Sequence, residues 1–121
     1  MKELLLITFI RALHFLISSN PLLKFSWKFI DCPEFQRLRN IKQLGFGCSY
    51  VFPGATHTRF EHCMGTGYLA AKMVNTLKLF LPKGEITNED IQNVTIAGLL
   101  HDIGHATNSH GFEYGVVKKL A

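Results

Sequence analysis

Residues 99–113 read LLHDIGHATNSHGFE, and this stretch carries most of the information on the fold and chemistry of the chain. An adjacent His101-Asp102 pair closes an apolar helical run. Neighbouring helical residues point roughly 100° apart, so the pair cannot share one face, but both side chains can converge on an ion beyond the helix end. Imidazole and carboxylate form a mixed N/O ligand set that suits divalent first-row metals. The stretch therefore predicts a metal site that a second element must complete.

The first candidate for that second element is His62, in Arg59-Phe60-Glu61-His62 at the start of another helix-like stretch. A competing interpretation pairs His101 with His105 at i, i+4, as in a degenerate H-E-x-x-H zinc protease helix. Gly104 weakens such a helix, and Asp102 is one methylene shorter than the usual glutamate. A protease helix would keep its metal without His62, so the two interpretations are separable.

Composition indicates one packed domain with a mild preference for anions. A chain of 121 residues with 47% hydrophobic residues can bury roughly 65% of its unfolded surface. The formal charge of +4 favours anionic partners such as phosphates. The three cysteines, Cys32, Cys48 and Cys63, match neither a C-x-x-C zinc pattern nor a disulfide framework. Reduced thiols in the nucleus or cytoplasm are the plainer interpretation.

Residues 1–19 form an apolar N-terminal segment that we separate from a domain over residues 20–121. Its apolar run, residues 4–17, is interrupted by Arg11 and His14. A helix of this length would rise about 21 Å, against ~30 Å for a hydrocarbon core. The segment also lacks a convincing small-residue cleavage site. We therefore expect a buried or partner-covered helix and no membrane span.

Capping and turn residues predict an all-α domain with five helical stretches. Asn20-Pro21 opens a helix that ends at Cys32, and Pro33 opens a second that reaches about Leu44. The third begins after Thr56 or Thr58 and runs to about Phe80. The fourth follows a capping box over residues 87–90 and delivers His101, and the last covers about residues 109–119. Residues 50–52 are expected to be extended or turn-like.

Helical spacing also predicts which side chains face the core. In the second helix these are Phe35, Leu38 and Ile41, leaving Arg37, Arg39 and Lys42 for solvent or anions. In the third helix they are Phe60, Met64, Tyr68, Met73, Leu77 and Phe80. The fourth helix is expected to be nearly all buried, through Ile91, Val94, Ile96, Leu99 and Leu100.

Several short segments, taken in order, resemble one known family. They are residues 35–39 (FQRLR), 41–45 (IKQLG), 51–55 (VFPGA), 59–62 (RFEH), 98–105 (GLLHDIGH) and 109–110 (SH). Together they resemble the HD-domain phosphohydrolases, and within these the deoxynucleoside triphosphate triphosphohydrolases of the animal sterile-alpha-motif and HD-domain type. The resemblance covers about residues 21–114, the opening part of that family's catalytic domain. It implies a helical HD-domain fold in truncated form.

The resemblance implies a role for each matching position. The metal ligands are His62, His101 and Asp102, for a divalent ion such as Zn, Fe, Mn or Mg. The substrate-binding residues are Gln43, Leu44 and Arg59, around the deoxyribose and phosphates of a deoxynucleoside triphosphate such as dGTP. The catalytic residues are His105, His110 and Glu113, with Glu113 in place of the usual aspartate. The regulatory residues are Asp31, Gln36 and Arg39, which read a guanine-nucleotide activator where subunits of a homo-oligomer meet.

The residue types make chemical sense of the implied reaction, which releases a deoxynucleoside and triphosphate. An ion clamped by the three ligands can polarise a phosphoryl oxygen, while Arg59 offsets charge on the phosphate chain. Histidine, with an ordinary pKa near ~6.5, can give or take a proton at neutral pH.

The chain also departs from the family pattern. No acidic residue follows Glu113, whereas the family takes its fourth metal ligand from a downstream aspartate. Whether the chain is itself an enzyme therefore stays open, and we expect a truncated form of one. The alternative is an inactive relative that binds nucleotide, single-stranded nucleic acid or an intact paralogue.

Overall fold

The computed structural model describes residues 11, 15, 18–19, 23–45 and 47–120, and these form a helical domain without β-strands. This confirms the predicted all-α class. The apolar N-terminal segment and the helix start at Asn20-Pro21 lie largely or wholly outside the described residues. The separation into 1–19 and 20–121 therefore stays a prediction. Among the described residues, no helix has the length and apolar character needed to cross a membrane.

The first described elements are short. A 3₁₀ turn, η1 (Lys24–Ser26), leads into α2 (Trp27–Ile30), and α3 (Pro33–Gln36) begins with its proline in the first turn. A second 3₁₀ turn, η2 (Arg37–Asn40), follows α3 directly. As predicted, Phe35, Leu38 and Ile41 are buried.

The predicted helix from Pro33 to Leu44 is wrong beyond Asn40. Ile41 is extended, with φ −109° and ψ 115°, and its carbonyl accepts a 2.8 Å hydrogen bond from the Arg59 amide. The amide of Gln43 donates to the His57 carbonyl over 3.1 Å, and an isolated antiparallel bridge joins Lys42 to Thr58. Pairing with a segment about 16 residues away overrides the local helical pattern here.

Residues 50–52, expected to be extended or turn-like, follow the second alternative in part, because Tyr50 and Val51 belong to one helical turn, α4 (Cys48–Val51). Gly47 begins this turn at φ +89°, a value that favours glycine. The Tyr50 amide donates to the Gly47 carbonyl over 3.0 Å. The Gly47 break therefore starts a turn instead of an extended segment.

Two long helices form the centre of the fold, and both start at the capping residues that the sequence predicts. The first, α5 (Arg59–Phe80), follows Thr58, whose side chain accepts from the Glu61 amide while the Glu61 carboxylate accepts from the Thr58 amide. The second, α6 (Asn88–Leu100), follows Thr87, which makes the same reciprocal pair with Asp90. Each box satisfies amides that the first helical turn leaves without partners.

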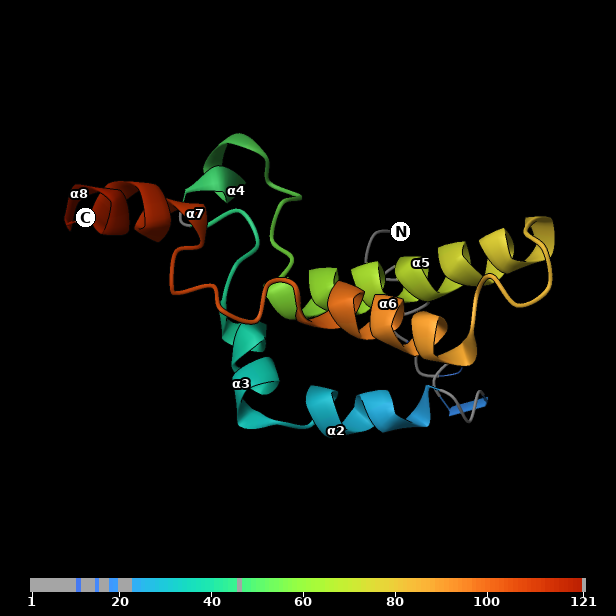
Figure 1. Ribbon diagram of the computed structural model, residues 1–121. Helices are drawn as coiled ribbons and strands as arrows, with labels where there is room; N and C mark the ends of the chain where they lie inside the picture. The colour runs from blue at the N-terminus through green and yellow to red at the C-terminus, as the bar shows by residue number, and fades with distance from the viewer. Residues whose placement is uncertain (1–10, 12–14, 16–17, 20–22, 46, 121) are drawn as a thin grey trace.

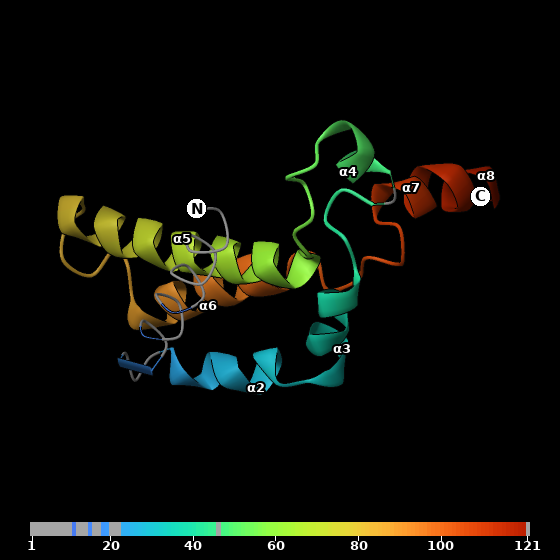
Figure 2. The ribbon, with the colours of Figure 1, turned by 180° about the vertical axis from the view of Figure 1, so that it is seen from behind.

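The two helices lie side by side and run antiparallel, as both views show (Figures 1 and 2). They approach closely because glycines face each other. A Cβ added at Gly98 would lie 2.9 Å from the Ala70 Cβ and 3.1 Å from the Thr66 carbonyl oxygen. The buried stripe of α5 accordingly includes the small residues Cys63, Gly67 and Ala71.

This close approach corrects two predicted apolar faces. On α5, Phe60 and Met64 are buried, but Met73 and Phe80 are 65% and 80% exposed, and Leu77 is also exposed. On α6, only Ile91, Thr95 and Leu99 are buried, at i, i+4 and i+8. A predicted stripe of large residues missed the small side chains that close helix packing selects.

The last segment confirms a helical run near residues 109–119 and divides it into three parts. These are α7 (His110–Phe112), the π-helical turn η3 (Glu113–Val117) and α8 (Lys118–Leu120). The run projects beyond the α5–α6 pair at the end where α5 begins, near α4 (Figures 1 and 2).

The Gly98 contact generates a stability prediction. Gly98→Val should destabilise the chain by about 1–3 kcal/mol, because the added atoms would have to displace the α5 backbone. Gly115→Val is the matched control, because a Cβ at Gly115 meets no atom within 4 Å. Urea unfolding followed by circular dichroism measures both. An equal loss in the two variants would contradict the close contact.

Candidate metal centre

The three predicted metal ligands come from the facing ends of α5 and α6. His62 lies in the first turn of α5, whose start the Thr58 capping box fixes. His101 follows the last residue of α6, and Asp102 comes next. Because the helices are antiparallel, the start of α5 and the end of α6 lie at the same end of the pair (Figure 1). The structure thus brings together the residues that the sequence predicts to meet.

The three ligand atoms form a small triangle. His62 Nε2 lies 3.1 Å from His101 Nε2, and Asp102 Oδ2 lies 3.4 Å and 3.3 Å from these two nitrogens. Ligands bound at about 2.1 Å to one ion are spaced by roughly 3.0 Å at right angles and 3.4 Å in a tetrahedron. The triangle therefore has the size of one face of a metal coordination shell, and these residues fit a single divalent ion.

A backbone carbonyl orients His101 toward this triangle. His101 Nδ1 lies 2.9 Å from the carbonyl oxygen of Gly98, one turn earlier in α6. A carbonyl can only accept, so Nδ1 is the donor and Nε2 is the ring nitrogen that faces the triangle. This is the usual arrangement of a histidine ligand, whose second nitrogen donates to a carbonyl or carboxylate.

Asp102 is held from the protein interior by Arg59. Arg59 is 1% exposed, and its Nη1 donates to Asp102 Oδ2 at 2.5 Å. A buried arginine without a partner would be costly, so the carboxylate is needed to keep the guanidinium in place. The same oxygen faces the imidazoles of His62 and His101, so Asp102 links the buried Arg59 charge to the triangle of predicted ligand atoms.

The remaining donors of Arg59 tie the site to two other segments. Arg59 Nε donates to the hydroxyl of Ser109 over 3.0 Å, and that hydroxyl donates to the Lys42 carbonyl over 2.5 Å. Ser109 is 2% exposed, with φ 51° and ψ −131°, a conformation that is strained for a residue other than glycine. The hydrogen bonds of its buried hydroxyl help to hold this strained backbone, from which His110 emerges.

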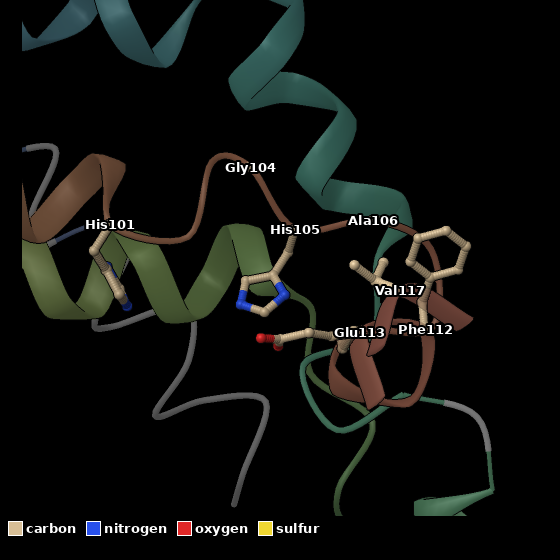
Figure 3. Close-up of a pocket in the computed structure, with 8 residues that line it drawn as sticks. His101, Gly104, His105, Ala106, Phe112, Glu113 and Val117 are labelled. Carbon is tan, nitrogen blue, oxygen red and sulfur yellow. The ribbon is translucent and has the colours of Figure 1, made fainter. Parts of the chain in front are cut away.

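The predicted catalytic residues form a second cluster beside the first. His110 Nδ1 lies 3.2 Å from Glu113 Oε2, and His105 Nε2 lies 3.4 Å from Asp102 Oδ1. Ligand-type atoms of His105, His110 and Glu113 all lie within 4.8 Å of one another. Figure 3 shows His105 and Glu113 pointing toward one another in a cavity of about 370 Å³ that His101 also lines. Asp102 thus contacts both clusters, through one carboxylate oxygen each.

Burial lowers the pKa of His62 and of His105 below the ordinary value of 6.5. For His62 the Asp102 carboxylate opposes this, whereas His101 and Arg59 add to it. For His105 the Arg59 charge adds to the lowering of the pKa. Both rings are therefore neutral at pH 7, the form that binds metal or accepts a proton. Burial raises the pKa of Cys63 to about 11, so this thiol stays protonated.

Of the three predicted substrate residues, Gln43 contacts Arg59. The carbonyl of Gln43 accepts a 3.4 Å hydrogen bond from Arg59 Nη2, and the buried side-chain oxygen of Gln43 has no hydrogen-bond partner. Leu44 is 50% exposed. Arg59 itself is occupied by Asp102 and Ser109 in this structure. Contact of these three residues with a substrate stays a prediction.

The predicted regulatory residues meet in a separate cavity of about 210 Å³. Asp31, Gln36 and Arg39 all line it. The Arg39 guanidinium lies 3.6 Å from the centre of the Phe60 ring, and Arg39 Nε donates to the Gln36 side-chain oxygen over 2.7 Å. Gln36 in turn donates to the Ile30 carbonyl over 2.7 Å. The structure brings these residues together, and nucleotide binding by them stays a prediction.

Sequence reasoning missed two residues that support the site. The sequence places Ser109 beside His110 at the start of the last predicted helix, but its hydrogen bonds to Arg59 and Lys42 depend on a strained backbone that no local pattern signals. Helical spacing assigns Arg37 to solvent or anions, but its guanidinium donates to the carbonyls of Ile103 and His105. Lys42 likewise donates to the Thr56 carbonyl over 2.6 Å.

Comparisons with known proteins agree with the resemblance stated from the sequence. Residues 59–120 match the HD domain family model. Deoxynucleoside triphosphate triphosphohydrolase SAMHD1 is 52% identical in Homo sapiens and 54% in Danio rerio, over 84% of this chain. The SAMHD1 homolog of Dictyostelium discoideum is 51% identical over 70% of the chain. The chain spans 16% of the length of each of these relatives.

The lowered histidine pKa values generate a pH prediction for the metal-free chain. A lowered pKa in the folded state gives stability that is present above the unfolded value of 6.5 and is lost as the pH falls through the folded value. The free energy of unfolding, measured in urea with a chelator, should therefore fall between about pH 7 and pH 5. His62→Gln should flatten this dependence, whereas the exposed His57→Gln should change it much less, because His57 is the smallest of the causes that lower the pKa of His62. Equal slopes in all three proteins would contradict the assignment.

Proposed function

The chain belongs to the HD-domain family, and on that premise we propose that it forms the metal site of a phosphohydrolase acting on deoxynucleoside triphosphates. The observation that carries the proposal is the triangle of His62, His101 and Asp102, with sides of 3.1–3.4 Å. The name of the relatives, deoxynucleoside triphosphate triphosphohydrolase, supplies the substrate class. The reaction would release a deoxynucleoside and inorganic triphosphate.

The metal-binding role falls to His62 Nε2, His101 Nε2 and Asp102 Oδ2, for a divalent Zn, Fe, Mn or Mg ion. When bound, such an ion supplies Lewis-acid polarisation of a phosphoryl oxygen. The protein contributes orientation: the Gly98 carbonyl fixes the tautomer of His101, and Arg59 fixes the carboxylate of Asp102. A site held in this way needs little reorganisation when a ligand arrives.

The second cluster is placed to move protons. Attack of water on the α-phosphorus forms one P–O bond and breaks the bond to the 5′ oxygen, so one proton must leave the water and another must reach the leaving oxygen. His105 is neutral at pH 7 and can accept a proton. His110 is held by Glu113 at 3.2 Å, and a paired imidazolium can donate one. We assign general base and acid chemistry to this cluster as a unit.

Two further sites belong to the proposal. Gln43 and Leu44 would contact the deoxyribose, next to the arginine that holds Asp102. Asp31, Gln36 and Arg39 would bind a guanine-nucleotide activator in their own cavity, at a surface where a second copy of the chain joins it. The planar Arg39 guanidinium over Phe60 supports a stacked base there, because both groups present flat faces.

The metal assignment can be tested on the whole chain. His62→Ala should weaken Mn²⁺ binding by more than about 100-fold, because loss of supporting residues alone costs roughly 10–100-fold. His57→Ala, an exposed histidine outside the triangle, is the control and should bind as the wild type does. Native mass spectrometry and calorimetric titration measure occupancy and affinity. Unchanged binding by His62→Ala would favour a protease-type site on His101 and His105.

The catalytic assignment has a separate test. With Mn²⁺ bound, the wild type should release triphosphate from dGTP, and His110→Gln should lower that rate about 10²–10⁴-fold. His110 lies outside the metal triangle, so Mn²⁺ affinity should stay unchanged in this variant. Phosphorus NMR of the products measures the rate and identifies triphosphate. Metal and dGTP binding without turnover by the wild type would contradict the enzyme proposal and support an inactive nucleotide-binding relative.

A further inference from the structure

An arginine from the first half of the chain reaches the loop that carries the candidate site. Arg37, at the start of η2, donates from Nη1 to the His105 carbonyl over 2.8 Å and from Nη2 to the Ile103 carbonyl. These partners lie 66 and 68 positions later in the sequence. The two carbonyls flank Gly104, so one guanidinium spans the backbone on both sides of this glycine.

Arg59 holds the loop near its two ends, at Asp102 and Ser109, whereas Arg37 holds the backbone between them. Residues 101–109 lie between α6 and α7, and a Cβ added at Gly104 would meet no atom within 4 Å. Two turn hydrogen bonds support the backbone directly beside Gly104, from the Ile103 amide to the Leu100 carbonyl at 3.0 Å and from the His105 amide to the Asp102 carbonyl at 3.1 Å. Glycine gives the backbone more freedom than any other residue. A long-range restraint on both sides of Gly104 therefore limits that freedom.

We propose that Arg37 is a positioning residue for the candidate metal centre. By holding the carbonyls of Ile103 and His105, it keeps Asp102 and His105 at the separation at which Nε2 of His105 lies 3.4 Å from Asp102 Oδ1. Asp102 is thus held twice, at its carboxylate by Arg59 and through the following backbone by Arg37. The inference rests on the proposed metal site.

The chemistry of arginine suits this task. Its planar guanidinium presents several donors in a fixed fork and can satisfy two carbonyls at once. A lysine ammonium is a single flexible point charge and would hold one carbonyl well. Arg37→Lys should therefore keep part of the effect that Arg37→Ala loses.

A purely electrostatic effect of Arg37 and a positioning effect would change cation affinity in opposite directions. A positive charge close to a cation site weakens cation binding, so removing Arg37 for charge reasons alone would strengthen it. Positioning predicts the opposite, a weaker site. Lys28→Ala, an exposed α2 residue, is the matched control because it removes the same charge. It should leave both readouts described below at wild-type values.

The first readout is independent of metal. In the metal-free whole chain, hydrogen–deuterium exchange in a peptide covering residues 101–109 should rise in Arg37→Ala and rise less in Arg37→Lys. Peptides from the buried half of α5 should keep their protection, which separates loosening of the loop from loss of fold. Unchanged exchange in the loop would overturn the proposal. Should Arg37→Ala fail to fold, the Lys variant decides the result on the same criterion.

The second readout is Co²⁺ affinity, followed by the visible absorption of the bound ion. Arg37→Ala should bind Co²⁺ about 10-fold or more weakly, with Arg37→Lys in between. Millimolar guanidinium chloride should restore part of the Arg37→Ala affinity, and equal sodium chloride should not. A freer loop with unchanged Co²⁺ affinity would overturn the positioning role alone. Absence of Co²⁺ binding by the wild type would overturn the metal site and this inference with it.

Discussion

The buried ion pair between Arg59 and Asp102 is the interaction on which the rest of the structure depends. Taking both charges out of water costs several kcal/mol per ion, so the pair persists only where the geometry and the remaining hydrogen bonds compensate. Here they do. Arg59 also donates to Ser109 and to the Gln43 carbonyl, and its amide donates to the Ile41 carbonyl. Two segments distant in sequence, residues 41–43 and 102–109, therefore meet at this one arginine.

The same pair places the carboxylate where the chemistry needs it. One oxygen of Asp102 faces Arg59 and the two imidazoles of the triangle, and the other faces His105. Asp102 is surrounded by nitrogen atoms on both oxygens, so the charge that holds the fold together also defines the site.

The sequence predicts the features that depend on residues close together in the chain, and it misses those that depend on residues far apart. Capping boxes act over three residues, and Thr58 and Thr87 accordingly mark the starts of α5 and α6 correctly. The proximity of His62, His101 and Asp102 is also predicted, because their residue types lie in a recognisable order, and metal binding by them stays a prediction. Ile41 is extended instead of helical because its partner is Arg59, and Arg37 binds a loop 66 positions away. No local pattern encodes such contacts.

The packing of α5 on α6 and the geometry of the candidate metal site depend on the same residue, Gly98. Its missing side chain lets α6 approach α5, and its carbonyl orients His101. The triangle joins His62 on one helix to His101 and Asp102 after the other, so an ion bound there would bridge the same two helices. Binding that favours the folded state alone stabilises it by about 2.7 kcal/mol at 100 times the Kd. In that case, occupancy of the site and the stability of the packed α5–α6 pair would rise and fall together.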